Sequence, residues 1–220
     1  LSKDETIVRT PFEVRHMGSK YPIFSFDFIG AKKGILPTSY DYLRLEGRMQ
    51  YRLNLPPVGY SRLMLEGGKI FGKVPYLLLK LHEGNGTYFY DRYAFSCMNF
   101  YEFSSDAWIS FFYEHHFNGF LLGRVPLLKK LNWREVFVFK GVYGTLSARN
   151  DGSLPNTEAV MLFPVGMSSV EHPYLETGFG IENIFRLLRV DCIWRLTHHR
   201  AVPGLSIPTF TVNFSLNLKF

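Results

Sequence analysis

The final twelve residues of the chain, 209–220, read Thr-Phe-Thr-Val-Asn-Phe-Ser-Leu-Asn-Leu-Lys-Phe. Every second side chain from Phe210 to Phe220 is apolar, and every side chain between them is polar. Successive side chains of a β-strand point to opposite faces, so this stretch would have one apolar and one polar face as a strand. A helix would spread the same residues around its circumference. The stretch therefore predicts a strand that separates two different environments.

The same two-residue period recurs along the chain. It is clear at 24–28, 43–54, 175–182 and 190–197, and weaker near 7–16, 59–70, 87–103, 107–120 and 134–147. Together with the final stretch, these segments predict about ten antiparallel strands, most of roughly 9–14 residues. We expect a single domain over 1–220 with no internal boundary.

The length of the predicted strands separates two kinds of all-β protein. Strands of soluble proteins usually have about 5–6 residues, whereas a tilted strand needs about 9–11 to cross a bilayer. The chain is 46% hydrophobic and 17% aromatic, with no run of the roughly 18 apolar residues of a spanning helix. The sequence therefore predicts an antiparallel transmembrane outer-membrane β-barrel, or the C-terminal part of a larger one. The alternative is a large soluble β-sandwich with one solvent-exposed face.

Charge and cysteine content argue against several classes of protein. The net charge is +6, but the basic residues are not clustered as a nucleic-acid surface requires, so we expect no nucleic-acid partner. Cys97 and Cys192 are too few for a disulfide framework and lack zinc-site spacing. We expect two free thiols on the lipid side and no cofactor or metal. The chain begins at Leu1 without a signal peptide, as expected for a mature or truncated exported chain.

The polar faces of the predicted strands carry charges of both signs. Buried ions need partners, so a narrow barrel would be closed by ion pairs, whereas a wide barrel would stay wet. We expect these side chains to face a lumen: Arg44, Glu46, Arg48, Arg52, Arg62, Glu66, Glu114, His116, Glu176, Glu182, Asp191 and Arg195.

A short motif occurs twice, 51 residues apart, as Gly-Lys-Val-Pro at 72–75 and Gly-Arg-Val-Pro at 123–126. Each copy is followed by leucines and lysines, which suit a segment that lies on a membrane surface. A well-packed turn over the barrel rim is the alternative. The predicted rim residues are Lys73, Pro75, Lys80, Arg124, Pro126, Lys129, Lys130 and Trp133.

The expected topology follows from placing the C-terminus in the periplasm. Residues 199–206 and 148–172 are then external loops, and 183–188 is a periplasmic turn. The connections 71–86 and 121–133 would both be periplasmic and unusually long. The aromatic Phe220, after a fully alternating strand, resembles the C-terminal signal of bacterial outer-membrane barrels.

Glu114, His115 and His116 are the most reactive cluster, because carboxylates and imidazoles can bind metals or transfer protons. Adjacent strand residues point to opposite faces, so the three cannot form one site without a bulge. Ser110 and His116 would lie about 20 Å apart on one strand. His115 has no evident serine on its own face, and a partner on a neighbouring strand stays open. We expect a polar network here.

Several motifs resemble one known family. Glu-His-His-Phe-Asn-Gly-Phe at 114–120, Val-Pro-Leu-Leu-Lys-Lys-Leu at 125–131 and Trp-Arg-Glu at 133–135 carry the resemblance, with shorter matches at 72–75, 88–91, 180–183 and 189–191. The stretch from about 40 to 220 resembles the C-terminal barrel of a Bacteroidota outer-membrane family. Its members carry a carboxypeptidase-regulatory-like domain and then an uncharacterised barrel domain. The resemblance implies an outer-membrane location and a longer parent protein, and it offers no catalytic residues.

These observations lead to one expected function with two alternatives. We expect a non-enzymatic integral outer-membrane barrel that acts in envelope biogenesis or transport, within a complex. Its expected partners are the lipid bilayer and other outer-membrane or periplasmic proteins. The first alternative is a passive porin-like channel. The second is an outer-membrane hydrolase that uses the cluster at 114–116, which requires a nucleophile beside a histidine.

Overall fold

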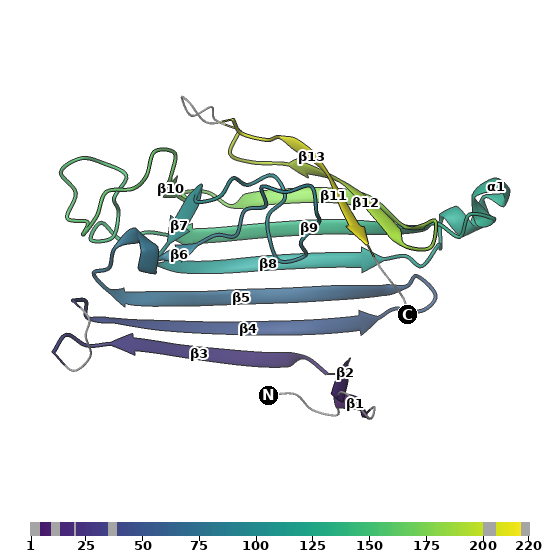
Figure 1. The fold of residues 1–220 in the computed structure, drawn as a ribbon, viewed down its shortest axis with the longest axis horizontal. Helices are drawn as coiled ribbons and strands as arrows, with labels where there is room; N and C mark the ends of the chain where they lie inside the picture. The colour runs from purple at the N-terminus through teal and green to yellow at the C-terminus, as the bar shows by residue number, and fades with distance from the viewer. Residues whose placement is uncertain (1–4, 10–13, 20, 35–38, 200–205, 217–220) are drawn as a thin grey trace.

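The computed structural model describes residues 5–9, 14–19, 21–34, 39–199 and 206–216. It is dominated by one antiparallel sheet of eight strands, so the predicted all-β antiparallel class is confirmed. The strands follow one another in chain order across the sheet (Figure 1). They are β3 (Ile23–Ala31), β4 (Tyr42–Asn54), β5 (Tyr60–Gly72), β8 (Ala107–His116), β9 (Arg134–Thr145), β11 (Tyr174–Ile184), β12 (Leu188–Arg195) and β13 (Phe210–Leu216).

The remaining elements are short. β1 (Glu5–Arg9) and β2 (Val14–Ser19) form a hairpin, and β6 (Lys80–Leu81), β7 (Phe103–Ser105) and β10 (Ser168–Ser169) form a small second sheet. Three helical turns complete the fold: the 3₁₀ turns Tyr76–Leu78 and Leu122–Arg124, and α1 (Pro126–Lys129). In the part of the chain that the structure describes, no helix has the length and apolarity needed to span a membrane.

The two faces of the large sheet differ in exposure: large apolar side chains lie exposed on one face, and charged side chains lie buried on the other. On the outer face, Phe26, Phe28 and Phe179 are 65%, 73% and 60% exposed. On the inner face, Glu114 and Asp191 are almost completely buried. The inner face also holds buried apolar side chains such as Met64, Phe112 and Val142, so it combines buried charges with an apolar core.

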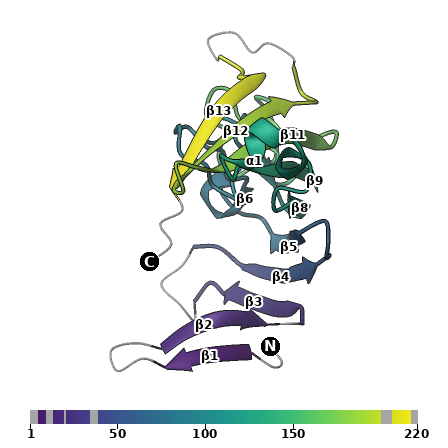
Figure 2. The same cartoon turned by 90° about the vertical axis from the view of Figure 1, so that its right-hand side faces the viewer.

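The sheet is strongly curled, and its two edges are not joined. In Figure 2 the strands turn from β3 at the bottom through β8 and β9 to β13 at the top, so the inner face is concave. β3 and β13 are the edges, and no described residues pair one with the other. The described residues therefore form an open, curled sheet.

The stretch 87–103 was predicted as a strand, and this prediction is wrong. It belongs to a long connection between β5 and β8, residues 73–106, here called the inserted segment, which folds onto the concave face (Figure 2). Phe95 and Met98 of this segment pack with Phe112 and Tyr174 of the sheet in a buried apolar cluster. Apart from β6 and β7, most of the segment is irregular, and part of its backbone bonds to the side chains of Lys140 and Glu176. Its residues Tyr88 and Tyr90 also bond to the backbone of Phe214 on β13.

The position of the inserted segment changes the predicted topology. Consecutive strands of a meander run in opposite directions, so their connections alternate between the two ends of the sheet. Without a strand at 87–103, the connections 73–106 and 117–133 leave opposite ends, whereas the sequence predicts the same end. The two Gly-basic-Val-Pro copies are therefore also at opposite ends. Near 7–16 the structure has parts of the β1–β2 hairpin instead of one strand.

Candidate functional site

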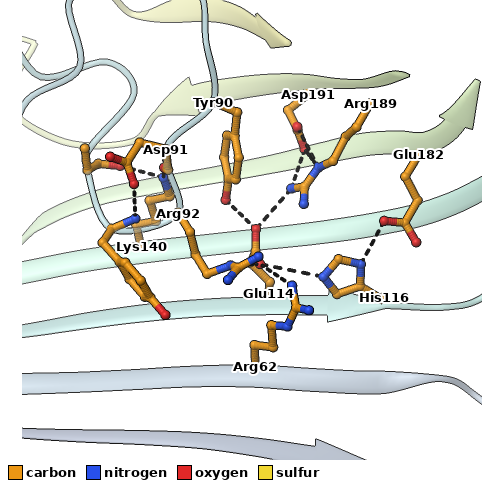
Figure 3. A network of polar contacts seen from close by, with 12 residues as sticks. Arg62, Tyr90, Asp91, Arg92, Glu114, His116, Lys140, Glu182, Arg189 and Asp191 are labelled. Carbon is orange, nitrogen blue, oxygen red and sulfur yellow. Dashed lines mark hydrogen bonds and ion pairs between the residues drawn. The ribbon is translucent and has the colours of Figure 1, made fainter. Parts of the chain in front are cut away.

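The centre of the inner face is Glu114 of β8, whose side chain is 2% exposed. Tyr90 and Arg92 of the inserted segment donate to its two carboxylate oxygens at 2.7 and 2.6 Å (Figure 3). Arg189 of β12 donates at 3.1 Å, and Arg62 of β5 lies 4.0 Å away. One carboxylate thus joins three elements of the sheet to the inserted segment.

The network continues towards the end of the sheet that holds the 55–59 turn. Arg189 also binds Asp191 at 2.7 Å. His116 lies 3.1 Å from Glu182 and stacks on the ring of Tyr60, with 4.4 Å between ring centroids. Figure 3 shows Arg189, Asp191, Glu182 and His116 gathered around Glu114.

Two further charges of the sheet hold the backbone of the inserted segment. Lys140 of β9 donates to the carbonyl oxygens of Asp91 and Ala94 at 2.7 and 2.5 Å. Glu176 of β11 accepts from the backbone N–H groups of Ser96 and Cys97 at 2.8 and 2.7 Å. Because these partners are backbone groups, the charges fix the path of the chain rather than a single side chain.

The neighbouring strands extend this anchoring. Arg195 of β12 binds Glu102 at 2.6 Å and the carbonyl oxygen of Cys97 at 3.1 Å. Asn213 of β13 donates to the carbonyl oxygen of Thr87 at 3.1 Å. The inserted segment is therefore bound by strands from β5 to β13.

A separate set of ion pairs lies at the other end of the inner face. Glu66 accepts from Arg48 at 2.6 Å and from Lys80 at 2.7 Å, and Lys80 also binds Glu83 at 2.8 Å. Burial alone would lower the pKa of Lys80, but the two carboxylates raise it above its ordinary value. Lys80 is therefore a buried cation that ties β6 to the wall.

The reactive side chains of the inserted segment are kept neutral. Burial, reinforced by Glu176, raises the pKa of the Cys97 thiol to about 12. Burial, reinforced by Lys80, lowers the pKa of His82 to about 3. Burial and Glu114 also raise the pKa of the Tyr90 hydroxyl well above its ordinary value. A nucleophilic thiolate or a histidine that acts as a base near neutral pH is not available here.

The predicted lumen residues all lie on the inner face of the sheet, but only some come together. Glu114, His116, Glu182, Asp191 and Arg62 share the central network, whereas Arg44 pairs with Glu46 at the opposite end. The other members are Arg48, Arg52, Glu66, Glu176 and Arg195.

The predicted rim residues divide between two environments. Lys80 differs from the prediction because it is buried, and Pro75 is also buried, whereas Lys73 is exposed. The members in the 117–133 connection lie at the surface, with Trp133 partly buried; they are Arg124, Pro126, Lys129, Lys130 and Trp133. Phe220 lies outside the described residues.

Sequence reasoning missed two cations that hold the network together. Lys140 stands alone in a row of valines on β9, and such a lone charge in an apolar row indicates a buried partner. Arg189 is two residues before Asp191, so both share one strand face. Cys97 was predicted to face lipid, and it is instead buried in the inserted segment; both cysteines are free.

A Ser–His pair lies on the outer face. Ser61 of β5 is 2.8 Å from Nδ1 of His115 on the neighbouring β8, and Tyr113 is 3.0 Å from the same hydroxyl. Nε2 of His115 is 3.1 Å from the carbonyl oxygen of Val58. This is the cross-strand partner that the sequence left open, but the third group is a backbone carbonyl and both side chains are buried.

The described residues contain no group of three or more His, Cys, Asp or Glu side chains placed to hold a metal ion. No curated protein matches the chain. Residues 5–148 match the model of a family described as the family of unknown function (DUF5686) C-terminal domain. Because this match covers more than half of the sequence, the chain belongs to the DUF5686 C-terminal domain family.

Proposed function

We propose that this chain forms the wall of an integral outer-membrane β-barrel whose lumen is closed by the inserted segment. It would act without enzymatic chemistry in envelope biogenesis or transport, in a complex with other outer-membrane or periplasmic proteins. The observation that carries the proposal is the inverted sheet, with exposed aromatic rows outside and buried ion pairs inside.

The composition of the outer face favours contact with lipid. Its rows of Phe, Leu, Val and Trp side chains extend over all eight strands, and a soluble protein rarely exposes so continuous an apolar surface. Strands of 7–13 residues in this sheet include several long enough to cross the hydrocarbon core. The family resemblance points to the outer membrane of Bacteroidota and to a longer parent protein.

The contacts of the inserted segment favour a closed lumen rather than a passive pore. Its backbone is bound by Lys140 and Glu176, and its side chains share Glu114 with the wall. Removing one partner of a buried ion pair typically costs about 3–5 kcal/mol. A segment held by several such contacts would block solute flow until a partner or ligand displaces it.

Planar-bilayer recording of the purified, detergent-refolded chain tests this proposal. The matched variant replaces residues 83–101 with a four-residue Gly-Ser linker, which is feasible because Leu81 and Ser104 are already paired neighbours. We expect the wild type to insert without steady conductance and the variant to conduct. Heat-modifiable mobility in gels shows that each protein is folded. Steady conductance of the wild type would favour the passive channel, and failure to insert would refute a spanning barrel.

Depletion of the protein in its native host tests the cellular role. Quantitative proteomics of the outer membrane should show loss of other envelope proteins, or uptake assays should show loss of a solute. An unchanged membrane proteome together with unchanged uptake would contradict the proposal.

A hydrolase is the second candidate because of the 2.8 Å Ser61–His115 contact. A serine hydroxyl that donates to a histidine nitrogen is the start of a nucleophilic pair. If this pair is catalytic, the purified wild type should release fatty acid from phospholipid micelles, and Ser61→Ala should abolish the release. His116→Ala, on the opposite face, is the matched control that should retain it. Absence of any wild-type release removes this candidate.

A further inference from the structure

We propose that a cavity at one end of the inner face binds a ligand that carries several phosphate groups. This inference rests on the proposed function, because the ligand must reach the inner face of the barrel, and it adds the chemical class of that ligand.

The cavity has a volume of about 1140 Å³ and lies at the end of the sheet that holds the 55–59 and 185–187 turns. Six arginines line it, each from a different part of the fold: β4, β5, the inserted segment, β9, the β11–β12 turn and β12. They are Arg52, Arg62, Arg92, Arg134, Arg186 and Arg189. Separate elements thus bring six guanidinium groups to one space.

The carboxylates around this cavity do not balance the arginines. Asp91 and Glu182 line it, and Glu114 and Asp191 lie just behind its wall as partners of Arg189. Among the described residues, arginines therefore outnumber carboxylates by two, even when all four carboxylates are counted. Glu182 is also already bonded to His116.

Three of the arginines have no carboxylate within ion-pair distance among the residues that the structure describes: Arg52, Arg134 and Arg186. Arg52 is instead held over the ring of Tyr60, 4.3 Å from its centroid, and Arg62 lies 5.3 Å from the same centroid. An aromatic ring orients a guanidinium without neutralising its charge. The guanidinium groups are therefore held in place before a ligand binds, and the carboxylates around the cavity are too few to neutralise them.

The donors fit phosphate in particular. A guanidinium is a planar fork of N–H donors that binds two phosphate oxygens at once, and it stays charged at all physiological pH values. The cavity is much larger than one phosphate. It also presents amides, including Asn54, Asn118 and Asn183, for neutral parts of a ligand. A ligand with two or more phosphoryl groups on a compact polar frame would use this space.

Isothermal titration of sodium tripolyphosphate into the full chain, folded in non-ionic detergent micelles, tests the proposal. The test variant is Arg52→Gln with Arg186→Gln, because both side chains are exposed and their loss should not unfold the protein. The matched control is Arg149→Gln, an exposed arginine near the opposite end of the sheet. We expect binding by the wild type, at least about tenfold weaker binding by the double variant, and less than about twofold change in the control.

Two further experiments define the chemical class and the source of the ligand. Citrate, a polycarboxylate of similar charge, should bind at least about tenfold more weakly than tripolyphosphate. Nanodiscs of phosphatidylcholine with cardiolipin, a lipid with two phosphates, should displace tripolyphosphate if a lipid headgroup is the natural source, and should not if the source is a soluble phosphate. No binding by the wild type, equal binding by the double variant, or equal binding of citrate would overturn the proposal. Because binding is measured in micelles, its failure is separate from a failure to insert or to block conductance in bilayers.

Discussion

Glu114 is the residue on which the inner face depends most. It is one buried carboxylate that serves Arg92, Arg189 and the hydroxyl of Tyr90, with Arg62 at 4.0 Å. Buried cations without a counterion are strongly unfavourable. Loss of this single negative charge therefore leaves Arg92 and Arg62 without a paired carboxylate, while Arg189 keeps its pair with Asp191.

We expect Glu114→Gln to lower the free energy of unfolding by about 3 kcal/mol, since the amide keeps the shape but not the charge. Urea unfolding of the detergent-solubilised protein, followed by fluorescence, measures the change. Glu158→Gln, in an exposed loop, is the control and should change stability by less than about 0.5 kcal/mol. Equal stability of both variants would show that the arginines are neutralised in another way.

His82 should make stability depend on pH. Burial lowers its pKa to about 3 in the folded protein, against about 6.5 when unfolded. The unfolded chain therefore takes up a proton below about pH 6.5 while the folded protein does not, so stability is complete above that pH and falls as the pH falls towards 3. Between pH 6.5 and 5 the loss should be about 2 kcal/mol.

Unfolding curves at pH 5, 6 and 7 measure this effect. Glu66 and Lys80 lie near His82, so their own titration must be separated from that of the imidazole. His82→Gln should flatten the curve in this range, and the exposed His199→Gln should leave it unchanged. A slope that persists in His82→Gln would assign the pH dependence to other groups.

At the residue scale, the sequence predicted which face each charge occupies but not its partners. The two-residue period places Glu114, Glu176 and Asp191 on one face without any knowledge of tertiary structure. Their partners Tyr90 and Ser96 lie 24 and 80 residues away in the sequence. No local pattern encodes such contacts, because they depend on where the inserted segment folds back.

At the scale of elements, the inserted segment is where sequence reasoning failed. The segments 43–54 and 190–197 lie mostly in strands. Their alternation reflects the two chemically different faces of the sheet. Around 87–103 a similar alternation arises because aromatic side chains such as Phe95 enter a buried cluster while the backbone binds Glu176. Periodicity alone does not separate these two causes.

Thiol labelling tests whether the inserted segment stays docked. Cys97 is fully buried with a pKa of about 12, whereas Cys192 on the outer face is partly exposed. Maleimides react with thiolates, so at pH 8 the unfolded protein should gain two adducts. The folded protein should gain at most one, on Cys192, because detergent covers the outer face. Intact mass measures both.

The assignment of that adduct comes from Cys192→Ser, which should remain unlabelled when folded. Rapid labelling of Cys97 in this variant would contradict a firmly docked segment. It would indicate that the segment leaves the sheet within the labelling time.

At the scale of the whole molecule, buried charges share the interior with an apolar core, and many large apolar side chains lie at the surface. Charges such as Glu176 and Lys140 are in the interior, and Phe28 and Leu216 are at the surface. The lipid contact that we propose would cover this exposed apolar surface. The alternation along the strands predicts the exposed apolar face. It does not predict the edges of the sheet at β3 and β13, because alternation carries no information about closure.

The three tryptophans provide a direct test of lipid contact. Trp194 is 41% exposed on the outer face near the end of β12 and packs against Phe210, whereas Trp108 is buried on the inner face. In phosphatidylcholine vesicles with brominated acyl chains, bromine quenches only tryptophans that touch lipid. We expect Trp194→Phe to remove most of the quenching and Trp108→Phe to leave it unchanged.

The depth of the bromine adds a second constraint. Trp194 lies near a strand end, where the bilayer interface should be, so bromine near the glycerol end of the acyl chain should quench it more than bromine near the chain's terminus. Trp133, in the 117–133 connection, contributes a background that is the same in both variants. If Trp108→Phe abolishes the quenching instead, lipid contacts the concave face, and the assignment of inside and outside in the proposed barrel is reversed.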